Sequence, residues 1–447
     1  MTRAHVSLSI NFHGVGVHPR SWKLVADRNR TWSFAAQLEV ARIAHDGVFD
    51  ALWLPDLPMA ITPPENAPLH ISDPQLLMAA IAASVPDIGV VPTVSSSYTD
   101  PYTVARNIAT LDNISGGRAG VNVIASYNAR IAQNYGQSHV PDYDDRYRRA
   151  DEYFDVLGKL SDSFRLTPHW HHPDLLIDPA KRREIDFKGD FFSIRGPLPS
   201  PQTSYGRPLL STAGGSDHAI DLAVRRADVL YAALVEKEAA RRFVSAIRTG
   251  VRSHGRPDGA VKVIPGIVPI IGSTQEEADR RLEQLTLLLG ESTDPAARVA
   301  KLLDLDPRDL HPDRPLTEAQ LTIPSARYTR PLGFFRAITD VARRGDLTVA
   351  ELAREFQLGG GHKIIVGTPD KIASVISDWF SAGAADGFVL HLQDLPGDAR
   401  DFVDHVVPLL RRKGIYPEGY SPGSLRQRLG IPDSDRIDGK FREAPAA

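Results

Sequence analysis

The sequence contains no cysteine among its 447 residues. The chain therefore has no disulfide bond, no thiolate metal site and no cysteine nucleophile. It also has little excess charge, because 52 lysines and arginines against 55 aspartates and glutamates give a formal net charge of −3. No extended basic stripe appears, and this argues against a nucleic-acid partner.

Long hydrophobic runs are missing as well. No apolar run is long enough to span a bilayer, and the start, MTRAHVSLSIN, lacks the continuous apolar core of a signal peptide. We therefore expect a cytoplasmic protein with no membrane partner. Hydrophobic residues still make up 42% of the chain, which is enough for a large core.

Strand-like and helix-like segments alternate along most of the chain. The expected strands cover residues 6–12, 51–56, 88–95, 119–125, 208–213, 229–234, 261–272 and 388–392. Eight strand–helix units favour an α/β protein with a (β/α)₈ TIM barrel over an open sheet. We expect one domain over residues 1–447, with a polar tail over residues 430–447.

Three segments break this alternation, at approximately 126–143, 165–206 and 290–361. Loops of this length usually carry function and are seldom new domains. We expect these insertions to form a lid over the C-terminal mouth of the barrel.

The most informative stretch runs from Ser95 to Ser126, where two expected strands flank a helix that ends at Ser115-Gly116-Gly117. Polar residues gather where the strands end, among them Asp56, Thr93 and Asn122. Each alone is best explained as a strand terminator or a helix cap. Because the strand ends of a barrel meet at one mouth, their coincidence on several strands predicts a polar ligand site.

A second motif, STAGGSDHAIDLAVRRA, spans Ser211 to Ala227. A strand runs into Gly214-Gly215 and a helix opens at Ser216. Backbone N–H groups at such a turn suit a phosphate, and glycine allows close approach. An ordinary serine N-cap after a flexible turn explains the motif equally well.

Other clusters carry weaker signals. Gly116-Gly117 precedes its strand and is expected to be a helix C-cap, while Gly359 to Gly361 is expected to act as a hinge.

HWHH, His169 to His172, has loose spacing without a carboxylate in helical register, so we expect packing or solvation and no metal site. Tyr143 and Tyr147 lie four residues apart and hence on one helix face.

The motifs FDALWLPD, SYTDPYTVARNIATLDNISGGRAGVNVIAS, DDRYRRADEYFDVL and IIVGTPDKIASVISDWFSAGAADGF are colinear and, with the turn motif, span nearly the whole chain. In them the chain resembles the bacterial luciferase-like flavin monooxygenases. It is most similar to the branch with nitrilotriacetate monooxygenase, dibenzothiophene-sulfone monooxygenase and pristinamycin IIA synthase. The resemblance implies FMN, bound as FMNH₂, at the strand C-terminal mouth.

The resemblance also implies roles for individual residues. His18 matches a histidine that faces the reactive edge of the flavin, where it would be catalytic. Gly215 and Ser216 with Tyr147 would hold the phosphate. The full cofactor-binding set is Asp56, Thr93, Asn122, Tyr143, Tyr147, Gly215 and Ser216.

The implied reaction has two components. A separate NAD(P)H:flavin reductase supplies FMNH₂, and the enzyme uses O₂ to oxygenate a small organic substrate. A homodimer or homotetramer is implied as well.

The chain departs from the family at several positions. Tyr143 stands where the family usually has histidine, Val121 replaces a tryptophan, Val17 replaces a histidine and Lys23 replaces an arginine. We expect these changes to alter the shape and polarity of the pocket. Two alternatives stay open: an F420-dependent oxidoreductase on the same fold, and a non-catalytic flavin-binding paralogue.

Overall fold

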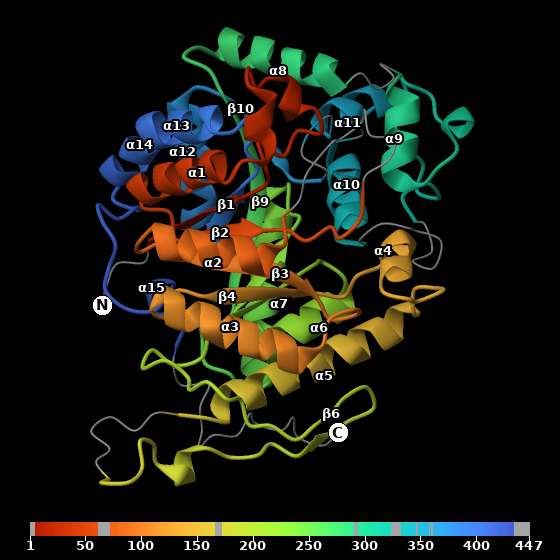
Figure 1. The fold of residues 1–447 in the computed structure, drawn as a ribbon. Helices are drawn as coiled ribbons and strands as arrows, with labels where there is room; N and C mark the ends of the chain where they lie inside the picture. Colours follow the sequence, from red (N-terminus) through yellow and green to blue (C-terminus); the bar gives the residue numbers. More distant parts are fainter. Residues whose placement is uncertain are drawn as a thin grey trace.

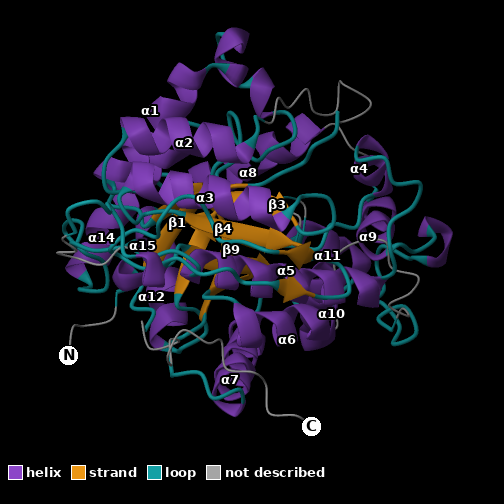
Figure 2. Cartoon of the chain, turned by 60° about the horizontal axis from the view of Figure 1, so that its bottom comes forward, coloured by secondary structure: helices purple, strands orange, loops and turns teal. Residues whose placement is uncertain are grey.

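The computed structural model describes residues 5–60, 72–165, 172–289, 294–322, 332–345, 347–356, 358 and 361–432. Eight parallel strands form a closed barrel surrounded by helices (Figures 1 and 2), which confirms the predicted fold. The strands are β1 (Ser7–Asn11), β2 (Ala51–Leu54), β3 (Gly89–Ser95), β4 (Gly120–Ile124), β7 (Leu209–Ala213), β8 (Val229–Ala232), β9 (Lys262–Ile271) and β11 (Gly387–Leu390). β11 pairs with β1 and thereby closes the ring.

A ninth strand, β10 (Lys363–Gly367), lies outside this ring. It pairs in parallel with the outer half of β9, from Ile267 to Ile271. The sequence predicted this segment only as the entry to the last unit and did not mark it as a separate strand. The third insertion therefore ends on a strand that is joined to the barrel.

Helices cover the outside of the barrel (Figure 1). They are α1 (Phe34–Asp46), α2 (Pro74–Ser84), α3 (Pro101–Ser115), α5 (Tyr143–Asp162), α6 (Asp217–Arg226), α7 (Lys237–Ser253), α8 (Gln275–Leu289), α12 (Pro369–Ser381), α14 (Val407–Arg412) and α15 (Leu425–Arg428). Asp73, Ser216 and Thr368 are side-chain N-caps. Gly116 is the left-handed C-cap of α3, as predicted.

The insertions differ in how much structure they contain. The first holds α4 (Ala129–Asn134), and the described part of the second holds the short hairpin of β5 (Phe187–Lys188) and β6 (Ser193–Ile194). The third holds α9 (Pro295–Leu303), α10 (Leu332–Gly345) and α11 (Val349–Glu355), which gather at one side of the barrel in Figure 1. Their buried residues form a second core of their own, which includes Val299, Leu303, Ile338, Val341 and Leu352.

The barrel interior changes from apolar to polar along its axis. Six inward side chains form one apolar cluster: Ala51, Val91, Leu209, Val229, Ile264 and Val389. Side chains two residues apart on a strand share a face. The next inward positions toward the mouth are Trp53, Thr93, Ser211, Tyr231, Gly266 and His391. Most of the inward side chains at the mouth are thus polar or aromatic, whereas the layer below them is apolar.

No helix in the described part of the chain combines the length and apolar character needed to cross a bilayer.

Candidate active site

A row of hydrogen-bonded side chains crosses β3, β4 and β7 near the mouth. Asn122 Nδ2 donates to Thr93 Oγ1 at 3.1 Å, and Ser211 Oγ donates to Asn122 Oδ1 at 3.3 Å. All three residues are buried. The structure therefore brings Thr93 and Asn122 together as predicted, and it adds Ser211 to them.

The turn between β7 and α6 lies against the first turn of α5. Ser216 caps α6 by accepting a hydrogen bond from the Ala219 N–H at 3.2 Å. A Cβ atom built on Gly214 would lie 3.8 Å from Tyr147 Oη. Ser216 is therefore an ordinary helix N-cap, which was one of the two interpretations of this motif. Its turn lies beside Tyr147, the tyrosine that we expect at the phosphate.

Tyr143 and Tyr147 face the same space as that turn. Their ring centroids are 5.0 Å apart, and the ring of His218 packs edge-on against Tyr143 at 4.9 Å. Burial, together with the neighbouring Tyr147 hydroxyl, raises the pKa of Tyr143 to about 12. Tyr143 Oη is buried with the Ser216 and Tyr147 hydroxyls as its polar neighbours, although no hydrogen bond of full geometry joins it to a described residue. A buried hydroxyl without a full hydrogen bond is costly, so this atom fits an oxygen-rich anion.

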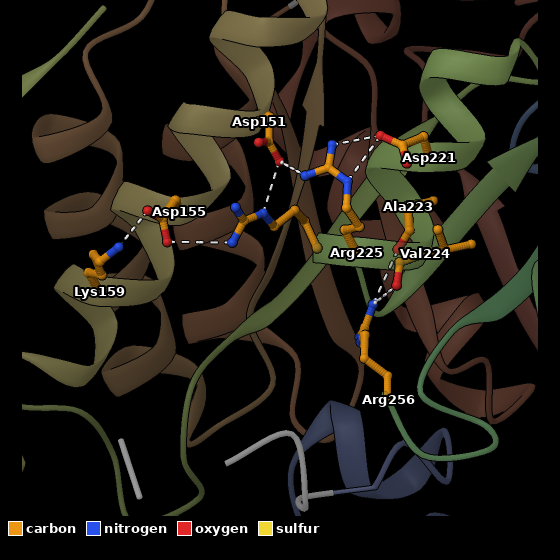
Figure 3. Close-up of polar contacts among 9 residues, drawn as sticks. Asp151, Asp155, Lys159, Asp221, Ala223, Val224, Arg225 and Arg256 are labelled. Carbon is orange, nitrogen blue, oxygen red and sulfur yellow. Dashed lines mark hydrogen bonds and ion pairs between the residues drawn. The ribbon is translucent and has the colours of Figure 1, made fainter. Parts of the chain in front are cut away.

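Ion pairs between α5 and α6 hold these elements together (Figure 3). Asp151 Oδ1 accepts from Arg225 at 2.6 Å and from Arg226 at 2.9 Å. At the far end of α6, Arg256 donates to the carbonyl oxygens of Ala223 and Val224, which belong to the last turn of the helix. The motifs DDRYRRADEYF and DLAVRRAD therefore fix the two helices whose N-terminal ends frame the turn.

The third insertion reaches the same turn. A Cβ atom built on Gly215 would lie 3.0 Å from Gly333 Cα at the start of α10. Arg336 donates to the Gly215 carbonyl oxygen at 2.7 Å and pairs with Asp217 at 3.0 Å. A side chain at either glycine would push the two backbones apart by a few tenths of an ångström.

Asp56 lies two residues beyond the end of β2 and is half-buried. Burial, with a smaller contribution from Asp73, raises its pKa to about 6. It is placed at the mouth, as the sequence predicted.

His18 is fully buried and bonded to the protein backbone. Its Nδ1 accepts from the Arg20 N–H at 3.0 Å, so Nε2 carries the proton and donates to the Leu285 carbonyl oxygen of α8 at 2.9 Å. Burial lowers the pKa of His18. The catalytic role implied for His18 stays a prediction, and in this arrangement the ring is a link between the first loop and α8.

Sequence reasoning missed a second polar cluster on the other side of the mouth. Tyr231 Oη lies 2.9 Å from His362 Nε2 and also hydrogen-bonds His391 Nε2. Asn11 Nδ2 reaches His391 Nδ1 at 3.3 Å. Asn11 ends β1 and His391 follows β11, so the rule that flagged Asp56 also marks these two strand ends.

Val121 does not line the mouth, contrary to our expectation. Its side chain alternates with Asn122 and belongs to the core between the strands and the surrounding helices. There it borders a cavity of about 30 Å³ together with Ala105 and Ile108 of α3 and Leu157 of α5.

The metal expectation for HWHH rests largely on residues 169–171, which lie outside the described residues. Within the described ranges, no group of three potential ligands is placed to hold a metal ion.

A closed barrel of eight parallel strands with surrounding helices and a polar mouth defines a TIM barrel. Residues 18–386 match the model of the luciferase-like monooxygenase family. The chain belongs to this family and is a flavin-dependent monooxygenase, which confirms the resemblance found in the motifs.

The similarity extends over whole chains. The chain is 32% identical to nitrilotriacetate monooxygenase component A of Aminobacter aminovorans, over 95% of this chain and 96% of that protein. It is 30% identical to N-acetyl-S-(2-succino)cysteine monooxygenase of Bacillus subtilis, over 96% and 97%. The solved structure of EDTA monooxygenase from Chelativorans sp. BNC1 matches with a TM-score of 0.83 and 35% identity, over 96% and 99%.

Proposed function

We propose that this protein is the oxygenase component of a two-component system. It would bind FMNH₂ from a separate NAD(P)H:flavin reductase and use O₂ to oxygenate a small organic substrate. Membership of the family and similarity to a protein named component A support this proposal. The observation that carries the choice of FMN is the buried Tyr143 hydroxyl beside Ser216, the N-cap of α6, because a hydroxyl at a helix N-terminus suits a phosphate.

In this proposal the two ends of FMN meet different residues. Gly215, Ser216 and the tyrosines Tyr143 and Tyr147 hold the phosphate. Asp56, Thr93 and Asn122 line the ring or the ribityl chain. When bound, reduced FMN supplies the electrons that activate O₂.

The chain's own contribution is to position the cofactor and to exclude water. Arg336 and Gly333 bring α10 onto the phosphate turn, so the third insertion is placed to close over the bound cofactor. We propose this segment as the lid, with homodimers or homotetramers as the working assembly.

Anaerobic titration tests the cofactor. We expect reduced FMN to bind at least about tenfold more tightly than reduced riboflavin, because hydrogen bonds to a charged group contribute about 1.5–3 kcal/mol. Retention of reduced F420 with no binding of reduced FMN would favour the F420-dependent alternative.

Turnover tests the reaction. With a flavin reductase, NADH and FMN, we expect O₂-dependent loss of a substrate from a panel that begins with nitrilotriacetate and N-acetyl-S-(2-succino)cysteine. Flavin binding without O₂-dependent turnover of any panel member would favour a non-catalytic paralogue. Size-exclusion chromatography with light scattering measures the assembly.

A further inference from the structure

The cluster of Asn11, His391, Tyr231 and His362 has a direction that follows from its atoms. An amide NH₂ can only donate, so His391 Nδ1 accepts from Asn11 and His391 carries its proton on Nε2. That proton is donated to Tyr231 Oη. The Tyr231 hydroxyl then donates to His362 Nε2 at 2.9 Å, which leaves the His362 proton on Nδ1.

The last donor of this chain has no partner. His362 is 5% exposed, and its Nδ1 makes no hydrogen bond with any described residue. The ring occupies space that a side chain on Gly266 would fill, since a Cβ atom there would lie 2.5 Å from His362 Nδ1. Phe334 of α10 packs edge-on against the same ring at 5.6 Å. Because a buried N–H without a hydrogen bond costs free energy, we expect a ligand acceptor at His362 Nδ1.

A second open donor belongs to the same part of the barrel. Trp53 Nε1 is buried and has no hydrogen-bond partner in the part of the chain that the structure describes, and its ring packs against Tyr231 with centroids 6.5 Å apart. Trp53 comes from β2 and His362 from the segment before β10, so the two observations are independent. This side of the mouth therefore presents N–H donors to whatever occupies it.

The cluster is also uncharged at neutral pH. Burial lowers the pKa of His362 to about 4 and the pKa of His391 well below its usual value. A carboxylate that binds these donors would lose its hydration without gaining a cationic partner. Removing a neutral oxygen from water costs much less free energy.

We propose that the Asn11–His391–Tyr231–His362 chain fixes His362 as a neutral donor whose Nδ1–H binds an uncharged acceptor oxygen of the substrate, such as an amide carbonyl. His362 contacts the ligand in this scheme, and Tyr231, His391 and Asn11 are positioning residues. The inference rests on the proposed function, because that function assigns Thr93 and Asn122 across the mouth, together with Asp56, to the flavin.

Histidine NMR tests the protonation pattern without any cofactor. In protein labelled with ¹⁵N-histidine, we expect His362 protonated on Nδ1 and His391 on Nε2, with assignments from the H362Q and H391Q spectra. Tyr231→Phe removes only the bridging oxygen and should abolish the single tautomer at both rings. Tyr153→Phe is the matched control, because Tyr153 Oη bonds Thr99 outside the barrel interior. His362 protonated on Nε2 would overturn the proposal.

Two ligands of the same shape test the acceptor. Acetamide is expected to shift the His362 Nδ1–H resonance saturably, and acetate at equal concentration is not. Tyr231→Phe should weaken acetamide binding about fivefold, which corresponds to one neutral hydrogen bond. No shift with acetamide, or an equal shift with acetate, would contradict the inference.

FMN alone provides the last comparison. If FMN shifts His362 as far as acetamide does, the donor serves the cofactor and the assignment to substrate is wrong. Failure of the proposed function is seen separately, as a lack of reduced-FMN binding in the anaerobic titration.

Discussion

Arg336 on α10 donates a hydrogen bond to the backbone carbonyl of Gly215 at 2.7 Å. The donor comes from the insertion with its own core, and the acceptor lies in the turn that opens α6. A single side chain thus couples the position of the insertion to the conformation of the proposed phosphate site.

Arg336→Met should weaken this coupling. We expect reduced FMN to dissociate about three- to tenfold faster, a modest effect because the arginine is half exposed. Stopped-flow displacement measures this rate. Arg343→Met is the matched control, since Arg343 lies on the same helix but bonds Leu321 within the insertion. Equal dissociation rates for Arg336→Met and the unmodified protein would show that α10 does not restrain the turn.

Tyr143→Phe removes the buried hydroxyl beside Ser216 and Tyr147 while keeping the ring contacts. We expect reduced FMN to bind about tenfold more weakly, because one hydrogen bond to a charged phosphate is lost. Reduced riboflavin carries no phosphate and should bind the variant and the unmodified protein equally. A parallel loss for both ligands would place the Tyr143 hydroxyl elsewhere in the site.

Asp56→Asn should change the pH dependence of stability. Burial raises the pKa of Asp56 to about 6 in the folded state, from an ordinary value of 3.8. The folded protein therefore holds this proton more tightly, and its stability falls as pH rises from about 4 to 6. The melting temperature of the variant relative to the unmodified protein should increase over that interval and stay constant above it. A constant difference from pH 4 to 8 would contradict this.

Asp228 holds the opposite end of the barrel together. Its buried carboxylate accepts two 2.7 Å hydrogen bonds from Arg207 and pairs with Arg426 at 3.3 Å. Although burial raises the pKa of Asp228, the two guanidinium groups bring it below its usual range.

Asp228→Asn should therefore lower the free energy of unfolding by about 3–5 kcal/mol, because two buried cations lose their counter-charge. The pKa is depressed, so this contribution is present above pH 4 and is lost as pH falls further. Thermal unfolding across pH measures both effects. Asp258→Asn, on an exposed pair with Arg252, is the control with little expected change.

Two substitutions of His18 distinguish its structural hydrogen bond to Leu285 from a catalytic role. His18→Gln keeps a donor near the Leu285 carbonyl, whereas His18→Ala leaves that buried acceptor unpaired. If the ring is a structural link, the glutamine variant should keep most of the melting temperature and of the NADH consumption coupled to product. A stable His18→Gln variant that releases only hydrogen peroxide would restore the catalytic role.

Local rules predicted the parts of the site that lie at strand and helix ends. Asp56 follows its strand, Ser216 caps its helix and Tyr143 faces the same way as Tyr147 because they are one helical turn apart. The alternation of side chains along a strand could also have shown that Val121 points away from Asn122.

Contacts between distant segments could not be predicted in this way. His362 directly follows the third insertion and carried no prediction, and only the tertiary fold places it over Gly266 and beside Tyr231, which is 131 residues away. Arg336 reaches a turn 121 residues earlier. The orientation of His18 depends on α8, which is 267 residues later. One chain provides no signal for such partners.

The pairing of β10 with β9 has a consequence for how this enzyme can be re-engineered. The chain leaves the barrel after β9 and returns beside the same strand, and the helices between form their own core. Residues 290–361 therefore form a separately packed insertion that is connected to the barrel beside β9 at both of its ends. Exchanging residues 290–361 between relatives would transplant the wall against His362 together with Gly333 and Arg336, so the contacts to the Gly215 turn must be kept in the exchanged segment.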